Sequence, residues 1–314
     1  MSLRIVFLGT PDFAVPSFDA LIGSRHDVVT VVSQPDRPKG RGQQLQPTPT
    51  KAAAVARGIP VIQPLKIRDD AFLQAIRDLR PDLGVVVAFG RILPDSLLAI
   101  PRLGMINVHA SILPRYRGAA PIQRAVLAGD AETGVSIMRV ASELDAGPVF
   151  SIARVPIPPD ATSGEMAGVL APLGAAELVP IVDALADGRA VETPQDHALA
   201  TLAPKIAKDE GIIDWIEPAA RIHDKVRGLQ PWPLASTTLN GERLVVRRTR
   251  VTALDAHDAA AATIVRAQGD DLTVACGGGT ALQILQIQPE GRRTMSAREF
   301  LAGRGTLEGA RVGT

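Results

Sequence analysis

The chain of 314 residues is long enough for two domains, each with a hydrophobic core of its own. Apolar residues make up 46% of it and charged residues 21%, and the net charge of +1 excludes the overall basic field of a protein that binds nucleic acid over its whole surface. The single cysteine, Cys276, excludes an internal disulfide framework and a cysteine-cluster metal site, and it fits a reducing cytoplasm.

The sequence also argues against a membrane or secreted protein. We find no apolar run near the roughly 18 residues that a membrane-spanning helix needs. The apolar stretch at the N-terminus is interrupted at Gly9 and Pro11, unlike the core of a signal peptide. We therefore expect a soluble, cytoplasmic protein without membrane contact, and we expect it to be a monomer.

Apolar runs alternate with helical patterns over the first half of the chain. This alternation predicts an α/β fold with a doubly wound, mostly parallel, Rossmann-like sheet. Ligands of such sheets bind at the carboxyl ends of the strands, where Gly9, Phe89 and His109 are expected to lie. The predicted strands are 3–8, 27–33, 83–89 and 105–109, and the predicted helices are 15–24, 51–57 and 69–79.

The pattern changes in the second half of the chain. An Ala- and Leu-rich helix over 163–186 closes a first domain, 1–189, and residues 190–204 lack a strong period and resemble a linker. A second domain, 205–314, begins with a predicted helix and continues in short alternating runs with Gly and Asp between them, which indicates an OB-like β-barrel. The helix is 218–228 and the runs are 235–239, 243–251, 263–267, 272–275 and 281–287.

The first strand ends in Gly9-Thr10-Pro11-Asp12. A dinucleotide-binding fold would have G-x-G-x-x-G at this place, and the second and third glycines are missing. A nicotinamide- or flavin-dependent enzyme is therefore disfavoured, and a tight turn with Pro11 at the start of a helix explains the motif better.

The most informative segment is GMINVHASILPRYRGAAP, Gly104–Pro121. Asn107 and His109 stand two positions apart at the end of a strand, so their side chains point to the same side of the sheet. An amide donor and an imidazole that converge at a ligand-binding edge suit the transfer of an acyl-type group. A single histidine is more often structural, and a metal site at His109 is disfavoured because no second ligand stands at a suitable spacing.

Two further features remain open on the residues alone. Asp145 lies in SELDAGPV between two apolar runs. An aspartate at such a place usually serves to form a turn. The alternative is that its carboxylate orients the imidazole of His109. The long loop QPDRPKGRGQQLQPTPTK carries Arg37, Lys39 and Arg41, and it is either a solvated insertion or an arm for a phosphate-bearing partner.

The second domain is only weakly basic. From Lys205 to Thr314 there are 15 Lys and Arg against 13 Asp and Glu, a net of +2. A local strip of arginines could contact a nucleic-acid backbone, and an exposed strand face would look the same. The strip consists of Arg243, Arg247, Arg248 and Arg250.

Taken together, these residues closely resemble the folate-dependent formyltransferase family. The motif NVHASILPRYRGAAPIQ is specific for the family, and the basic loop and the later signatures are similar to those of members that act on tRNA. The resemblance extends from the N-terminus to about Ala235. The other matching segments are FLGTPDFAVP, SQPDRPKGRGQ, VVVAFGRILP, ETGVSIM, KIAKDEGIIDW and GLQPWPLA.

The resemblance implies that 10-formyltetrahydrofolate, a co-substrate, donates its formyl group to the α-amino group of methionine on initiator tRNA, without a metal. Asn107, His109 and Asp145 match the catalytic set, with Asp145 holding the imidazole in the useful tautomer. Where the family often has DTGD, this chain has DAGP, so Pro148 replaces an acid. The implied folate-binding residues are Ser111, Ile112, Leu113, Pro114, Phe89 and Ile92, and the implied tRNA-binding residues are Arg37, Lys39, Arg41, Lys205 and Lys208.

Two other functions compete with this one. A formyltransferase for a sugar-nucleotide or another small amine would use the same three catalytic residues, but it would leave the basic loop without a purpose. A non-catalytic RNA-binding protein would explain the loop and the barrel, but it would leave the Asn107 and His109 pair idle.

Overall fold

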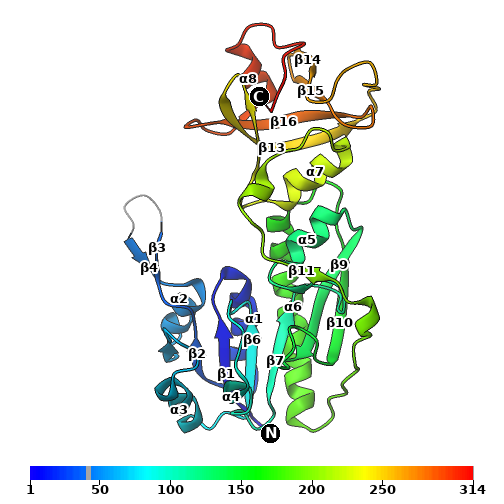
Figure 1. The fold of residues 1–314 in the computed structure, drawn as a ribbon. Helices are drawn as coiled ribbons and strands as arrows, with labels where there is room; N and C mark the ends of the chain where they lie inside the picture. The colour runs from blue at the N-terminus through cyan, green and yellow to red at the C-terminus, as the bar shows by residue number, and fades with distance from the viewer. Residues whose placement is uncertain (40–43, 314) are drawn as a thin grey trace. The chain divides into compact units, whose positions relative to one another are not determined.

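The computed structural model describes residues 1–39 and 44–313, and it divides into two compact units (Figure 1). Unit 1 comprises Met1–Pro121, Glu132–Pro156 and Ala167–Pro204, and unit 2 comprises Ile122–Ala131, Ile157–Met166 and Lys205–Thr314. The segment 190–204, which resembles a linker in the sequence, belongs to unit 1. Backbone hydrogen bonds between Thr193 and Val149 attach it there.

Unit 1 is built on a seven-stranded sheet in the order β10-β9-β7-β6-β1-β2-β5. All pairs are parallel except those made by β9, which runs antiparallel to β7 and β10. This mostly parallel sheet confirms the predicted fold class. The strands are β1 (Arg4–Gly9), β2 (Asp27–Val32), β5 (Val61–Ile62), β6 (Leu83–Val87), β7 (Met105–His109), β9 (Glu132–Arg139) and β10 (Val149–Pro156).

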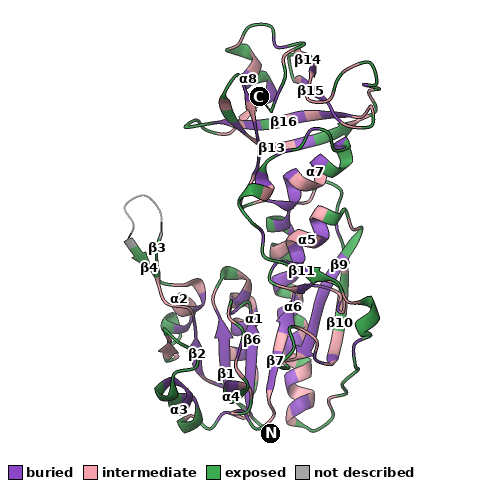
Figure 2. Ribbon diagram, in the orientation of Figure 1, coloured by how far each residue is buried: buried purple, intermediate pink, exposed green. Residues whose placement is uncertain are grey.

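The strands at the centre of this sheet are buried because helices cover them (Figure 2). All five residues of β6 are buried, as expected for a parallel strand that is covered on both faces. Side chains at the first turns cap two of the helices: Thr48 accepts from Lys51 N, and Asp69 from Ala71 N and Phe72 N. The helices that begin in unit 1 are η1 (Asp12–Ala14), α1 (Val15–Ile22), α2 (Pro49–Ala56), α3 (Asp70–Asp78), α4 (Asp95–Leu98), α5 (Pro121–Ala128) and η2 (His197–Leu199).

The longest helix, α6 (Ser163–Ala186), corrects one expectation. By length and composition alone it could cross a membrane, although we expected no such segment. Charged residues divide its sequence into shorter apolar runs, which is why a search for an unbroken run misses it. In the fold, Leu170, Leu178 and Val182 are fully buried, and a Cβ at Gly174 would lie 2.6 Å from Val108 Cγ1, so α6 packs directly on β7.

Two small strand pairs complete unit 1. The basic loop contains an antiparallel hairpin, with β3 (Arg37–Lys39) paired to β4 (Gln44–Gln46). In the second pair, β8 (Arg117–Gly118) runs parallel to β11 (Leu202–Ala203). The sequence predicts neither pair because each strand is only two or three residues long.

Unit 2 contains an antiparallel sheet in the order β12-β13-β16-β15-β14, with β17 paired to β16. Its core includes Trp215, Leu282 and Phe300, and burial raises the pKa of the Cys276 thiol to about 12, so this cysteine is a protonated core residue. The barrel-like domain confirms the predicted class. Its elements are η3 (Asp209–Gly211), α7 (Ala219–Gly228), β12 (Ala235–Leu239), β13 (Glu242–Thr252), β14 (Ile264–Gln268), β15 (Asp271–Ala275), β16 (Ala281–Pro289), β17 (Met295–Ser296) and α8 (Ala297–Ala302); β11 lies in unit 1.

Candidate active site

Strand β7 presents the two central side chains of the candidate site. Asn107 pairs with Val86 of β6 and Met138 of β9, and His109 pairs with Ser136 of β9. Because the two residues are separated by one position in a regular strand, their side chains leave the same face of the sheet. Asn107 is half-buried and His109 is 5% exposed. The carboxyl end of β7 therefore holds both groups in a mostly dry environment.

The imidazole of His109 is held by a backbone carbonyl. Its Nε2 lies 2.9 Å from the carbonyl oxygen of Tyr116. A carbonyl oxygen only accepts, so Nε2 bears the ring proton in the neutral form, and the tautomer is assigned from this partner. Nδ1 is then the lone-pair nitrogen, and it lies 3.7 Å from Asp145 Oδ2. The Tyr116 carbonyl, rather than Asp145, fixes the tautomer, because 3.7 Å is too long for a hydrogen bond.

Asp145 lies in the turn between β9 and β10 and adopts a left-handed conformation with φ +47°. Its Oδ2 accepts a hydrogen bond of 2.9 Å from Gly118 N, and its side chain is 17% exposed. A carboxylate at this distance from Nδ1 stabilises the positive charge that the imidazole gains when it takes up a second proton. The structure thus brings Asp145 to His109 as an electrostatic partner.

The DAGP turn keeps its shape without the second acid. A Cβ at Gly147 would lie 2.0 Å from the carbonyl oxygen of Arg139, so only glycine fits at this close approach. The carbonyl of Pro148 accepts from Arg139 N at 2.9 Å, a bond that needs no N–H from the proline. Pro148 is therefore compatible with the position of Asp145.

The side-chain amide of Asn107 has no hydrogen-bond partner among the residues that the structure describes. Because Asn107 is only half-buried, its amide is open to solvent and available to a ligand. Its N–H₂ group can donate to an oxygen placed between it and His109. A carbonyl oxygen that becomes an oxyanion during acyl transfer has the required chemistry.

The loop 111–114 follows β7 and is tied to the neighbouring strand. Ser136 Oγ of β9 donates to the carbonyl of Ser111 at 2.7 Å and accepts from Leu113 N at 3.1 Å. The Ser111 hydroxyl, which is fully buried, donates to the carbonyl of Arg115 at 2.6 Å. Leu113 is buried against Met138 and Val149, whereas Ile112 and Pro114 are half-buried. The exposed faces of Ile112 and Pro114, rather than Ser111 or Leu113, are thus the side chains that a ligand could touch.

The two other residues in the predicted folate set differ in exposure. Phe89 is 2% exposed and packs in the core with Val6 and Met105, so in this structure it presents almost no surface to a ligand. Its carbonyl accepts from Thr10 Oγ1 at 3.2 Å. Ile92 is 76% exposed, which leaves an apolar side chain in solvent at the carboxyl end of the sheet.

We call the loop 34–51, which contains the β3–β4 hairpin, the hairpin arm. Contacts of Lys51 join the two ends of this arm. Lys51 Nζ contacts Asp36 Oδ2 at 2.6 Å and Gln63 Oε1 at 2.8 Å, and Lys51 and Gln63 hold the pKa of the Asp36 carboxyl below its usual value. Arg37 is exposed in β3, and Lys39 ends the same strand. Arg41, the arm's predicted key residue, lies outside the described residues.

In unit 2, Lys205 and Lys208 are exposed, and neither amine has an acidic partner within the described part of the chain. An ion pair holds the backbone between them. Arg124 of α5 contacts Glu210 at 2.6 Å and donates to the carbonyl of Lys205 at 3.4 Å, and Glu210 accepts from Ala207 N at 2.7 Å. Arg124 is the main cause of a lowered pKa at Glu210.

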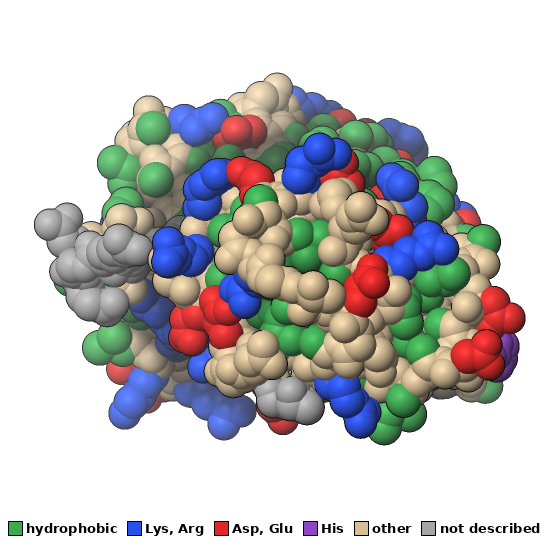
Figure 3. Space-filling model, turned by 90° about the horizontal axis from the view of Figure 1, so that it is seen from above, with side chains coloured by type: hydrophobic (Ala, Val, Ile, Leu, Met, Phe, Trp, Pro, Cys, Tyr) green, Lys and Arg blue, Asp and Glu red, His purple; other side chains and the backbone are tan. Residues whose placement is uncertain are grey.

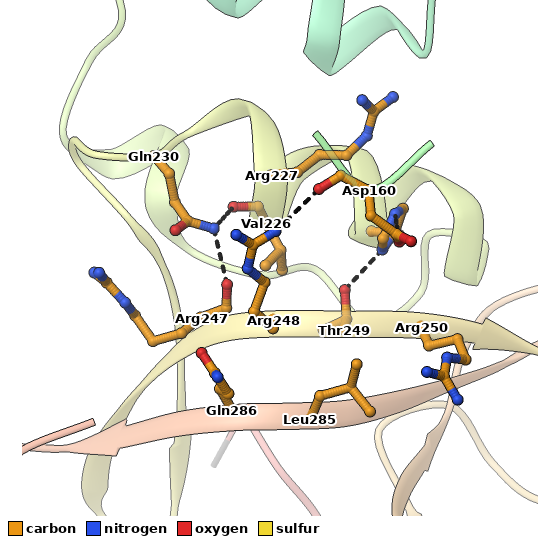
Figure 4. A pocket seen from close by; sticks show the side chains of 11 residues that line it. Asp160, Val226, Arg227, Gln230, Arg247, Arg248, Thr249, Arg250, Leu285 and Gln286 are labelled. Atoms are coloured by element: carbon orange, nitrogen blue, oxygen red, sulfur yellow. Dashed lines mark hydrogen bonds and ion pairs between the residues drawn. The ribbon is translucent and has the colours of Figure 1, made fainter. Parts of the chain in front are cut away.

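Three arginines of the predicted strip, Arg247, Arg248 and Arg250, border a cleft of about 250 Å³ in unit 2, and Arg243 is not among its lining residues (Figure 4). Arg248 is largely engaged there, because it contacts Glu165 at 2.6 Å and donates to the Asp160 carbonyl at 3.1 Å. On the face shown in Figure 3, basic and acidic side chains are interspersed, so that face lacks a field of one sign. Among the described residues no group of three His, Cys, Asp or Glu could hold a metal ion.

Sequence reasoning missed the groups that hold the site together. The Tyr116 carbonyl and the Gly118 N–H are backbone groups, and their roles depend on a fold that the residue letters do not specify. Ser136 lies in GVSIM, a segment singled out for its apolar run, and its hydroxyl faces the 111–114 loop only because β9 is antiparallel to β7. A serine inside a buried strand was the available signal.

Comparison with known proteins identifies a matching family for each of the two parts of the chain. Residues 3–182 match the formyl transferase family, and residues 205–305 match the formyl transferase C-terminal domain family. The chain is 46% identical over 311 residues to a methionyl-tRNA formyltransferase of Moorella thermoacetica, covering 99% of each protein. It is 47% identical over 313 residues to a methionyl-tRNA formyltransferase of Methylococcus capsulatus, covering 99% of this chain and 100% of that one.

Solved structures of lower identity share the fold. An N-formyltransferase of Helicobacter canadensis, in complex with folinic acid and dTDP-3-aminofucose, is 15% identical with a TM-score of 0.68, covering 90% of this chain and 98% of the other. HypX of Aquifex aeolicus, in complex with tetrahydrofolic acid, is 15% identical with a TM-score of 0.65, covering 96% of this chain and 47% of the other.

Proposed function

This chain belongs to the methionyl-tRNA formyltransferase family, and from that premise we propose that it transfers the formyl group of 10-formyltetrahydrofolate to the α-amino group of methionine on initiator tRNA. The single observation that supports this most is the carboxyl end of β7. There Asn107 offers an amide without a protein partner, next to an imidazole whose protonated nitrogen is already engaged.

The reaction follows from these groups. The neutral amine of the aminoacyl ester attacks the formyl carbon, a C–N bond forms, and the formyl oxygen becomes an oxyanion that accepts a hydrogen bond from Asn107. His109 Nδ1 takes the proton that the amine loses, and Asp145, at 3.7 Å, stabilises the resulting imidazolium. The bond between the formyl carbon and N10 of the folate then breaks, and the proton passes to N10, so that tetrahydrofolate leaves.

The folate donor is assigned to the loop that follows β7. Ile112 and Pro114 present their exposed faces in this loop. Ser136 holds the peptide backbone of Ser111 and Leu113 through two hydrogen bonds. Ile92 adds an exposed apolar side chain. Phe89 supports the proposed site from the core behind it. A flat pterin ring suits apolar side chains next to rigid peptide groups. The chemistry assigned to Asn107, His109 and Asp145 needs no metal.

The tRNA is assigned to basic groups in each unit. In unit 1 these are Arg37, Lys39 and Arg41 of the hairpin arm, and in unit 2 they are Lys205 and Lys208. Because the net charge of the whole chain is only +1, such local groups must supply the attraction to phosphates. We propose that residues 1–189 form the catalytic part and that residues 205–314 form the tRNA-binding part of a monomeric cytoplasmic enzyme.

The test uses the purified full chain with 10-formyltetrahydrofolate labelled at the formyl carbon, together with either initiator Met-tRNA or a dTDP-linked amino sugar. We expect label in formyl-methionyl-tRNA, and none in the amino sugar. Label in the amino sugar alone would establish a small-amine formyltransferase instead. Binding of tRNA without label transfer in either mixture would indicate a non-catalytic RNA-binding protein.

A further inference from the structure

We propose that Gln195 is a positioning residue of the active site, which holds the Asp145 turn in register with β8. The inference rests on the proposed function, because it assigns Gln195 a part in that reaction. Gln195 lies in the segment 190–204, which has no clear pattern in the sequence and is anchored to unit 1 through Thr193 and Val149.

Gln195 uses its whole hydrogen-bonding capacity in this place. Its side-chain nitrogen donates to the carbonyl oxygens of Asp145 at 2.8 Å and Gly147 at 2.7 Å. Its side-chain oxygen accepts from Arg117 Nε at 3.1 Å and Arg117 Nη2 at 2.8 Å. A side-chain amide has two N–H donors and one oxygen with two lone pairs, so all four positions are filled. With 8% exposure, Gln195 is a buried bridge between two segments.

The two bridged segments are those that position the catalytic groups. On one side is the turn that bears Asp145. On the other is the segment 116–118, in which the Tyr116 carbonyl receives the proton of His109 Nε2 and the Gly118 N–H donates to Asp145 Oδ2. Gln195 bonds to the side chain of Arg117, midway between these two backbone groups. A single side chain thus links the residues that orient both His109 and Asp145.

The contacts are also difficult to replace. Arg117 is 5% exposed, and its Nη1 reaches Glu143 Oε1 and His197 Nδ1 only at 3.5 Å each. The bonds to the Gln195 oxygen at 2.8 and 3.1 Å are therefore its shortest polar side-chain contacts among the described residues. Asp145 adopts a left-handed backbone, which aspartate tolerates better than most residues other than glycine. The two bonds that the Gln195 amide donates to carbonyls of this turn fix its position relative to Arg117.

Two variants separate the halves of the bridge. Gln195→Leu removes all four hydrogen bonds. Gln195→Glu keeps an acceptor for Arg117 but places oxygen atoms against the carbonyls of Asp145 and Gly147, so only the turn is released. We expect each to lower kcat for formylation of Met-tRNA by about 10²-fold, the usual effect of displacing a catalytic group by about 1 Å. The KM values for tRNA and folate should stay near those of the wild type.

Two readouts distinguish positioning from simple destabilisation. The amide proton resonance of Gly118 should move upfield in both variants, because its bond to Asp145 lengthens. In a double-mutant cycle, Gln195→Leu should cost almost nothing further in an Asp145→Asn background, because both changes act on the same carboxylate. The matched control is Gln230→Glu in unit 2, where the amide likewise donates to two carbonyls, those of Val226 and Arg247, at 3.1 and 2.8 Å (Figure 4).

The outcomes are distinct. Folded Gln195→Glu protein with wild-type kcat, an unmoved Gly118 amide, or additive losses in the cycle would overturn the inference; if Gln195→Leu fails to fold, Gln195→Glu decides. The control should keep wild-type kcat and leave the Gly118 amide unmoved. A wild-type enzyme that forms no formyl-methionyl-tRNA contradicts the proposed function instead, and the Gly118 amide, measured without substrate, still tests the bridge.

Discussion

Individual residues in this enzyme act through partners that are often backbone groups. His109 is held by the Tyr116 carbonyl, Asp145 by the Gly118 N–H, and the loop 111–114, which we propose binds folate, by the hydroxyl of Ser136. Since the protein supplies these partners before substrate arrives, the proposed catalytic groups need little reorganisation when charge develops.

At the same scale, the Arg124–Glu210 pair predicts a pH-dependent contribution to stability. Arg124 lowers the pKa of Glu210 below its usual 4.5, so the pair stabilises the fold above pH 4.5 and is lost as the pH falls through the lower, folded value. We expect the difference in Tm between wild type and Arg124→Met to shrink as the pH falls below 4.5. Thermal unfolding monitored by circular dichroism measures it.

A matched control is Arg154→Met, which removes the exposed pair with Glu132. Exposed pairs contribute little, so its Tm difference should be small at every pH. A difference for Arg124→Met that stays constant from neutral pH to well below 4.5 would contradict the assignment of the pair.

The residues that the sequence could identify are those whose function follows from spacing. Asn107 and His109 share a face because they stand two positions apart in a strand, and this holds in β7. The role of Asp145 could not be read from a turn motif, because its distance to His109 depends on how β9 and β10 pack. The roles of Tyr116 and Gly118 belong to the backbone and depend on β8 pairing with β11.

Among the elements, the long and strongly patterned ones could be predicted. The ranges of α6 and β12 coincide with the predicted ones, because α6 is a long run rich in Ala and Leu and β12 lies between Pro233 and Gly241, which mark its two ends. Helix α5 is not among the predicted elements, although Pro121 is well suited to the first position of a helix. Short strands such as β8 and β11 depend on distant partners and give no local signal.

The hairpin arm is the element for which charge predicts function. Arg37→Ala and Arg41→Ala should each weaken binding of Met-tRNA and reduce the salt dependence of its affinity by about one released counterion. Binding of the folate donor should be unchanged. The measurement is a titration of tRNA at several salt concentrations, followed by fluorescence anisotropy.

Arg77→Ala, at an exposed position of α3, is the control and should leave the salt slope of tRNA binding unchanged. Equal loss of tRNA and folate binding in the arm variants would show that the arm is not a tRNA contact.

For the whole molecule, the proposed function divides the task between the two units. Unit 1 holds the groups that we propose act on the formyl carbon and the proton, and each unit offers a few basic side chains in a chain of net charge +1. The predicted domain boundary at 190–204 rests on the composition of the sequence, whereas the compact units are defined by contacts in the fold. By these contacts the segment 190–204, which includes Gln195, belongs to unit 1. Composition cannot show that a side chain of such a segment, Gln195, reaches the turn that bears Asp145.

The central claim is that the imidazole at the end of β7 performs the transfer, and single-turnover formylation of initiator Met-tRNA by His109→Ala tests it most directly. We expect the rate to fall by about 10²–10⁴-fold, the usual contribution of a general acid–base group, while tRNA affinity is unchanged. The exposed His257→Ala should behave as wild type. Wild-type turnover in folded His109→Ala protein would contradict the account.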